Sequence, residues 1–406
     1  RVQFRQGRLL GLARPHLHEG SPVTWSVATA SVPMMRAFDH ALARRTTSES
    51  VLLRIEESGR VGWGEAAPRS YVTGETVQSV LARLTSARTQ ALAREAASLE
   101  DDEFVAWCRT DAFGPGAGET GLEPAARAAV GTALLDLKSR QTGRPVHDFL
   151  AMAAPTLATQ PRTVSMTQVL DLSTDPQDLL ATKATGRWAT HIKAKVGAVE
   201  DVVTRVRAIR TAIPPTTTLS LDANASLRLE DWAPLLDTLV ELGVAWIEEP
   251  VRIRDWAEMR ALRQRGMAVM LDESFTSHED MELALEHQAA DFLNVRVSKC
   301  GGPLRAAAMA ETAVAHGLGY QVGVQVAELG PLWAAGRALA THLDGSVARE
   351  GGQQDRWFAT PLTEPPYAVD RDNWTIAPLP GPGLGVTPSP WLIEHLEPAT
   401  TRTEQP

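Results

Sequence analysis

The chain has 406 residues, of which 44% are hydrophobic and 22% are charged. This length exceeds what one ordinary hydrophobic core supports, so we expect a globular enzyme with two domains. The formal net charge of −9 argues against nucleic acid or an anionic membrane as a partner. Two cysteines are too few for a disulfide framework, and no apolar run is long enough to span a membrane, so a cytoplasmic location is expected.

The first 150 residues combine strand and helix patterns. SVLLRIEESGRVGWGEA (50–66) alternates around a short turn and predicts a β-hairpin. The long segment 14–36, rich in Ser, Thr and Pro, is predicted to be a loop that is either a lid or disordered. Apolar residues recur at helical spacing between residues 74 and 150. We therefore predict an α+β capping domain over residues 1–150, with 14–36 as its substrate-specificity lid.

Strand-like and helical segments alternate from about residue 160 onward. The predicted strands are PRTVSM (161–166), HIKAK (191–195), TLSLD (218–222), VAWIEE (244–249), AVMLDE (268–273), FLNVRVSK (292–299), GYQVGV (319–324) and SVARE (346–350). Eight such units predict an α/β fold, a (β/α)₈-type barrel over residues 151–375. An open doubly wound sheet normally has a Gly-rich loop after its first strand, which PRTVSMTQVL lacks. We expect the C-terminal segment 376–406 to return to the capping domain.

Five ionisable residues mark the ends of successive predicted strands. They are Lys195, Asp222, Glu248, Asp272 and Lys299, separated by 27, 26, 24 and 27 residues. Side chains at the C-terminal ends of parallel barrel strands converge on one face. Three carboxylates in register repel one another unless a cation neutralises them, and hard cations such as Mg²⁺ prefer carboxylate oxygens. One such acid is equally explained as a helix N-cap, but three in register favour a metal site.

The lysines predict acid–base chemistry. Lys193 and Lys195 are two residues apart and share one face of a strand. Because two neighbouring ammonium groups repel each other, the lysine pair is expected to have a lowered pKa, toward the range useful for a base at neutral pH. Lys299 ends the strand across the barrel, so two lysines would address opposite faces of one carbon. Glu249 and Glu273 each follow a predicted ligand, and spacing alone leaves open which acid of each pair faces inward.

A shared motif set resembles the enolase superfamily and, within it, the muconate-lactonizing-enzyme subgroup. The matching motifs are KAK (193–195), DAN (222–224), IEEP (247–250), LDES (271–274) and SKCGG (298–302). RRTTSESVLLRI and GWGEAAPRSYVTGET look most like the dipeptide epimerases. ARAAVGTALLDLKSRQTGRPVHDFL and PGPGLGV extend the resemblance over nearly the whole chain. Enzymes of this superfamily use a Lys or His base and Mg²⁺ to stabilise an enediolate.

The resemblance implies roles for the residues that match. The implied metal ligands are Asp222, Glu248 and Asp272, with Mg²⁺ as the cofactor and Mn²⁺ as a substitute. The implied acid/base pair is Lys195 and Lys299, supported by Lys193, Asn224 and Glu273. The implied activity is a racemase or epimerase that abstracts the proton α to a carboxylate of an amino-acid derivative or dipeptide. A cycloisomerase or dehydratase using the same enediolate step is the alternative, and a homo-oligomer is expected.

The substrate contacts are predicted less directly. Dipeptide epimerases carry an Asp-x-Asp on the eighth strand that holds the substrate ammonium, and VAREGGQQD (347–355) lacks it. Glu350 is the candidate substitute in this small-molecule carboxylate site, and Tyr71 is a further candidate. Glu328 follows the seventh strand and is either a substrate contact or an acid at a helix start.

Overall fold

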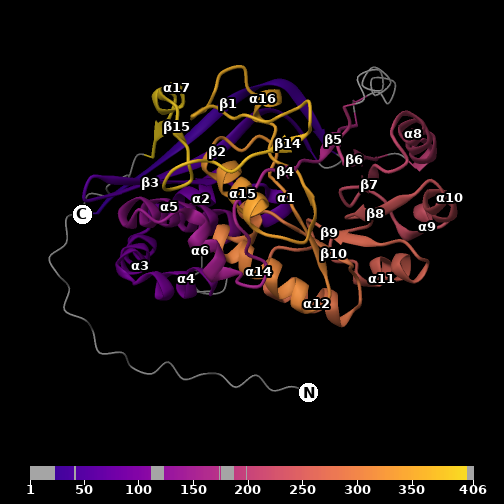
Figure 1. The fold of residues 1–406 in the computed structure, drawn as a ribbon, viewed down its shortest axis with the longest axis horizontal. Coiled ribbons are helices and arrows are strands. Elements are labelled where there is room, and N and C mark those ends of the chain that lie inside the picture. Colours follow the sequence, from indigo (N-terminus) through magenta and orange to yellow (C-terminus); the bar gives the residue numbers. More distant parts are fainter. Residues whose placement is uncertain are drawn as a thin grey trace.

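The computed structural model describes residues 23–40, 43–110, 123–172, 174, 187–197 and 199–399. An antiparallel sheet with its own helices lies beside an eight-stranded parallel sheet flanked by helices (Figure 1). The predicted barrel with a separate α+β domain is therefore confirmed as a fold class. No helix in the described part of the chain is long and apolar enough to cross a membrane.

The antiparallel sheet is built from residues of both chain ends. In spatial order its strands are β16 (Glu397–Pro398), β1 (Thr24–His40), β2 (Ala43–Glu57) and β3 (Arg60–Ala66). The predicted hairpin is present as β2 and β3. The predicted loop over 14–36 is wrong for residues 24–36, which belong to β1, and residues 14–22 lie outside the described residues. The β-branched residues Thr24, Val27, Thr29 and Val32 suit a pleated strand, despite the loop-like Ser and Pro content of the segment.

Helices follow the strands β1, β2 and β3 of this sheet in the chain. They are α1 (Ser70–Thr73), α2 (Val77–Leu84), α3 (Ala87–Ser98), α4 (Asp101–Arg109), α5 (Pro124–Thr142) and α6 (Val146–Ala153). Of these, α2 and α5 pack directly on the strands of the sheet. The α5 helix lies directly on β3 because glycines line the contact. A Cβ built on Gly64 would lie 1.9 Å from the Ala129 carbonyl oxygen. The helix ends at Gly143, whose φ of 71° is a left-handed C-terminal stop.

The eight parallel strands follow one another in chain order. They are β5 (Gln168–Leu170), β6 (His191–Lys195), β7 (Thr218–Asp222), β8 (Val244–Glu248), β9 (Val269–Leu271), β10 (Phe292–Val295), β11 (Gly319–Val322) and β12 (Ser346–Arg349). The first and last strands approach each other, since the Thr167 amide donates to the Arg349 carbonyl at 2.7 Å. The first strand predicted over 161–166 is displaced. Residues Val164–Ser165 form β4, which pairs with β14 (Thr375–Ile376), and the barrel strand begins at Gln168.

Helices alternate with the barrel strands. They are α8 (Val199–Ala212), α9 (Leu229–Trp232), α10 (Leu236–Glu241), α11 (Trp256–Gln264), α12 (His278–Glu286), α13 (Val297–Cys300), α14 (Pro303–Ala315), α15 (Pro331–His342) and, after the last strand, α16 (Gln354–Trp357). A further helix, α17 (Pro390–Glu394), lies in the C-terminal segment. A last strand pair, β13 (Thr363–Glu364) and β15 (Thr387–Pro388), lies in the C-terminal part of the chain.

Buried carboxylates connect the two sheets and the C-terminal segment. Glu65 on β3 accepts hydrogen bonds from the amides of Leu329 at 2.7 Å, Gly330 at 3.0 Å and Leu332 at 3.3 Å. These amides precede or begin α15, so the capping domain holds the start of a barrel helix. Asp136 on α5 accepts from the amides of Trp63 at 2.9 Å and Leu384 at 2.8 Å. The C-terminal segment is thereby attached to the capping domain.

Candidate active site

The ionisable residues lie where neighbouring parallel strands end. Lys195, Asp222 and Glu248 are the last residues of β6, β7 and β8, and Asp272 follows β9 directly. The predicted strand over 292–299 stops at Val295, so the expectation that Lys299 ends a strand is wrong. Lys299 lies in the one-turn helix α13, which Gly301 terminates with a φ of 80°.

The two lysines lie at opposite ends of the carboxylate row. Lys195 Nζ donates to Asp222 Oδ2 at 2.9 Å and to Asn224 Oδ1 at 2.5 Å. Lys299 Nζ lies 2.8 Å from Asp272 Oδ1, and its ammonium lies 5.3 Å from the centre of the Phe275 ring. Both lysines are buried. The strand order therefore places one lysine beside the first carboxylate of the row and the other beside the last.

The predicted supporting residues are also part of this cluster. Asn224, which binds Lys195, donates through Nδ2 to Glu273 Oε1 at 3.3 Å. Asn224 has a φ of 44°, in the left-handed region that Asn tolerates better than most residues. Both side chains are almost fully buried. Hydrogen bonds thus connect the end of β7 to the residues that follow β9.

Glu248 is the acid at the centre of the row. Both of its oxygens lie 3.1 Å from Lys193 Nζ, and they accept from Asn294 Nδ2 at 2.8 Å and Gln321 Nε2 at 3.3 Å. Burial raises the pKa of Glu248 to about 8, with Lys193 opposing the rise and neighbouring carboxylates adding to it. Glu249 instead accepts from backbone amides of the segment after β9. Glu248 is therefore the member of the pair that faces the charged cluster.

The predicted fall in the pKa of Lys193 is not found in this structure. Burial lowers that pKa, but Glu248, Glu350 and Asp222 together raise it well above its ordinary value. Lys193 Nζ lies 3.5 Å from Asp222 Oδ2 and forms an ion pair with Glu350. The effect of three acids from three other strand ends on the pKa of Lys193 outweighs that of the neighbouring Lys195 ammonium. Only the lysine pair could be recognised in the sequence.

Arg296 is a residue that the sequence analysis missed. Its guanidinium forms a buried ion pair with Asp272 and lies 3.8 Å from Glu248 Oε1. Asn294, two residues earlier, binds Glu248 from the same strand. The alternation of polar residues in FLNVRVSK was the available signal, because residues two apart on a strand share a face.

The donor chemistry of the row fits a hard divalent cation. Asp222, Glu248 and Asp272 present carboxylate oxygens only, and each side chain is almost completely buried. Asp272 Oδ1 accepts no hydrogen bond, although Lys299 is its ion-pair partner. Within the described residues, no three acidic, His or Cys side chains converge as a metal site. In this structure two cationic side chains, Lys193 and Arg296, neutralise the row of carboxylates.

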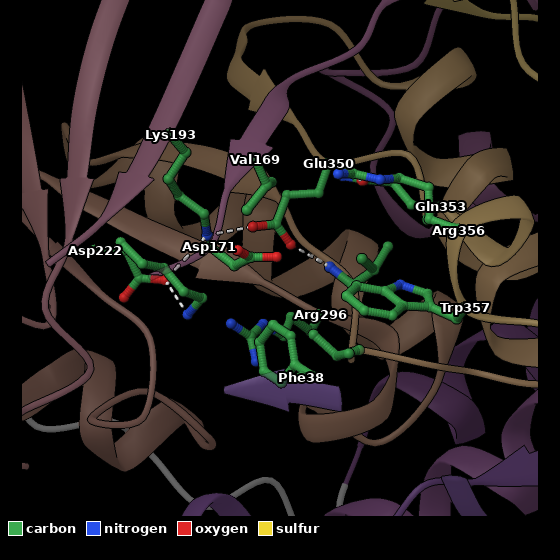
Figure 2. Close-up of a pocket in the computed structure, with 14 residues that line it drawn as sticks. Phe38, Val169, Asp171, Lys193, Asp222, Arg296, Glu350, Gln353, Arg356 and Trp357 are labelled. Carbon is green, nitrogen blue, oxygen red and sulfur yellow. Dashed lines mark hydrogen bonds and ion pairs between the residues drawn. The ribbon is translucent and has the colours of Figure 1, made fainter. Parts of the chain in front are cut away.

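A cavity of about 50 Å³ that opens to solvent adjoins one end of the row (Figure 2). The residues that line it lie on or just after six of the barrel strands, at α16, and on β1 of the capping domain. They are Phe38, Val169, Asp171, Lys193, Lys195, Asp222, Arg296, Val324, Val326, Glu350, Gly352, Gln353, Arg356 and Trp357. The cavity thus brings a predicted base and a predicted metal ligand to the same wall.

The three predicted substrate contacts have different locations. Glu350 lines the cavity, and its Oε2 accepts from the Val324 amide at 2.8 Å. Tyr71 lies outside that cavity, on α1, with the Arg45 guanidinium 5.6 Å from its ring centre. Glu328 is also outside it and accepts from the Gln325 amide at 2.8 Å. It precedes the first residue of α15 by three positions, so it closes a tight turn rather than starting the helix.

The protein has a parallel barrel with a capping domain, and carboxylates and lysines lie at or just after the ends of the barrel strands. These features together define a class of barrel enzymes. Residues 178–391 match the family model described as enolase C-terminal domain-like. Residues 24–151 match the mandelate racemase/muconate lactonizing enzyme N-terminal domain. The chain therefore belongs to the mandelate racemase/muconate lactonizing enzyme family of the enolase superfamily, as its motifs predicted.

Curated and solved relatives agree with this assignment. A hydrophobic dipeptide epimerase of Citrifermentans bemidjiense is 32% identical over 312 residues, covering 74% of this chain and 81% of the relative. The crystal structure of N-succinyl Arg/Lys racemase from Bacillus cereus has a TM-score of 0.79 and 23% identity, covering 93% and 98%. A dipeptide epimerase from Enterococcus faecalis, complexed with Mg and L-Leu-L-Tyr, has a TM-score of 0.74 and 22% identity, covering 91% and 100%. The curated epimerase confirms the predicted enzyme class, an isomerase, and the two solved structures share the fold.

Proposed function

We propose that the protein is a racemase or epimerase that removes the proton α to a carboxylate and returns it from the opposite face. The observation that carries this proposal is the placement of Lys195 and Lys299 at opposite ends of the carboxylate row. Two lysines on either side of one carbon, one as a neutral amine and the other as an ammonium, supply both a base and an acid. The curated relative with 32% identity is an epimerase, which supports the same reaction type.

Each lysine has a partner that fixes its position. Asp222 and Asn224 hold the Lys195 ammonium, while Asp272 holds that of Lys299. One lysine in its neutral form accepts the α proton, and the other, as ammonium, donates a proton to the opposite face. The two exchange roles in the reverse direction. Because both side chains are buried, water competes poorly for these protons.

The proposed cofactor is Mg²⁺, held by Asp222, Glu248 and Asp272. When bound, it would supply positive charge to the substrate carboxylate, where negative charge develops as the proton leaves. The Mg complex of the Enterococcus faecalis epimerase supports this cofactor. Lys193 would keep its place beside Glu248 and Glu350 and contribute charge at the edge of the row.

The proposed substrate is a small carboxylate derived from an amino acid, either an N-acyl amino acid or a dipeptide. The test is incubation of the protein with Mg²⁺ in D₂O and a panel of both substrate types. We expect deuterium at the α carbon of both stereoisomers, read by mass spectrometry after chiral separation. A substrate that turns over without deuterium exchange would contradict the proposal. A product lighter by one water, or one with changed connectivity, would instead identify a dehydratase or a cycloisomerase.

A further inference from the structure

The cavity beside the carboxylate row has two chemically different ends. Figure 2 shows Lys193 and Asp222 at one end and Gln353, Arg356 and Trp357 at the other, with Glu350 between them. A substrate whose α carbon reaches the lysines would therefore extend its remaining groups toward Arg356. This second end has no role in the proton-transfer chemistry described above.

Arg356 is a cation with a neutral partner. It lies in α16, and its Nη1 donates to the side-chain oxygen of Gln353 at 2.7 Å. Across the described ranges of the chain, no carboxylate forms an ion pair with its guanidinium. Arg356 is partly buried, and burial is the main cause of its lowered pKa. A partly buried guanidinium of this kind gains most from an arriving anion.

Charges of both signs surround Arg356. Arg36 and Arg371 act on it as like charges, whereas Asp171 and Asp355 act as opposite charges. Asp355 is already bound to Arg371, with oxygen–nitrogen distances of 2.8 and 2.9 Å. An incoming ammonium would be repelled by the Arg356 guanidinium, and a carboxylate would be attracted to it.

The same end has a fixed apolar wall. Phe38 on β1 packs edge-on against Trp357, with ring centres 5.5 Å apart. The segment leading to them is held in place, since Tyr367 Oη donates to the Gly351 carbonyl at 2.8 Å. Gly351 has a φ of 71°, and a Cβ there would lie 2.6 Å from Met166 Sδ. A wall fixed before binding loses little conformational freedom when a substrate enters.

We propose that Arg356 determines specificity by binding a carboxylate at the distal end of the substrate's acyl group. The preferred substrates are then N-acyl amino acids whose acyl group is a dicarboxylic acid, rather than dipeptides with a free ammonium. This inference rests on the proposed racemase or epimerase function and refines its substrate. It agrees with the replacement of an Asp-x-Asp by VAREGGQQD at the eighth strand.

The test compares three probes that share one amino acid. They are N-succinyl-L-leucine with an anionic tail, its succinamide analogue with a neutral tail, and L-Ala-L-Leu with a cationic tail. With Mg²⁺ in D₂O, we expect kcat/KM for the succinyl compound to exceed that for its amide about ten- to a hundred-fold, the range of one charge-assisted hydrogen bond. The dipeptide should be the poorest of the three.

Variants attribute this preference to one residue. Arg356→Gln should bring the ratio of succinyl to succinamide rates close to one. Arg54→Gln is the matched control, because Arg54 pairs with Glu56 on β2 and does not line the cavity, and it should retain the ratio. Asp171→Asn removes the competing carboxylate and should widen the ratio. Circular dichroism and unfolding curves establish that each variant is folded.

The outcomes separate this inference from the proposed function. Exchange with all three probes but no preference for the anionic tail, or a preference that persists in Arg356→Gln, overturns the role of Arg356 and leaves the function standing. If no probe exchanges deuterium, the proposed function fails, and calorimetric binding of the same probes decides the inference. Arg356-dependent preference for the succinyl compound in binding supports it, and no such preference overturns it.

Discussion

Arg296 offers the sharpest prediction about the charged row, because it neutralises Asp272 and Glu248 in this structure. Arg296→Met retains most of the side-chain volume and removes the charge. Breaking a buried ion pair from one side costs about 3–5 kcal/mol, because the remaining charge is left uncompensated. In the metal-free protein we expect the free energy of unfolding to fall by about that amount. With Mg²⁺ bound, the cation supplies the missing charge, and the loss should be only about 1 kcal/mol of packing.

The difference between these losses is also a prediction about metal affinity. A destabilisation that is about 2–4 kcal/mol larger without the metal requires Mg²⁺ to bind the variant about thirty- to a thousand-fold more tightly, by thermodynamic linkage. The assays are urea unfolding in EDTA and in excess Mg²⁺, together with calorimetric titration of the metal. Arg254→Met is the matched control. Arg254 forms an ion pair with Asp280 at 2.7 Å outside the row, so its loss should be equal in both conditions. Equal losses for Arg296→Met as well, with unchanged Mg²⁺ affinity, would refute the reasoning.

Three further predictions concern the framework that holds the site. Glu65→Ala leaves three buried amides without their acceptor and should lower the free energy of unfolding by roughly 3 kcal/mol in urea titrations, with a smaller loss for Glu65→Gln. Burial, aided by Lys193, lowers the pKa of His191 from 6.5 to about 3, so the stability that its neutral form permits is lost as pH falls below 6.5. The wild type should therefore lose about 2 kcal/mol more than His191→Asn between pH 7 and pH 5. Gly64→Ala should cost about 3 kcal/mol, because its methyl group would overlap the Ala129 carbonyl of α5; a neutral result in urea would contradict the close packing.

The regular spacing of the charged residues along the chain made much of the site predictable. Strand and helix units of nearly constant length place Lys195, Asp222 and Glu248 at strand ends, and the structure has them there. Lys299 was predicted in the correct part of the chain but on the wrong kind of element. An apolar run gives no indication of where a strand stops and a single helical turn begins. Such a boundary is set by a positive φ, here at Gly301, and by contacts with other segments.

Properties that depend on contacts between several strands could not be predicted from the sequence of a single strand. The pKa of Lys193 is governed by acids from three other strand ends, and its direction is opposite to that expected from Lys195 alone. Arg296 was overlooked because its partners lie far away in the sequence. The Ser, Thr and Pro content of residues 24–36 suits a loop as well as a strand, so composition alone predicted a loop there. Their strand is established by pairing with β2, which is information from tertiary structure.

The central claim is that Lys195 and Lys299 act on opposite faces of one carbon, and single-lysine variants test it most directly. With a confirmed substrate in D₂O, Lys299→Ala and Lys195→Ala should each lose at least about a hundred-fold in interconversion of the stereoisomers. Each variant should still exchange the α proton of one stereoisomer only, and the two variants should differ in which one. Lys138→Ala, outside the site, should behave as the wild type. Loss of exchange with the same stereoisomer in both variants, or full interconversion in either, would contradict the account.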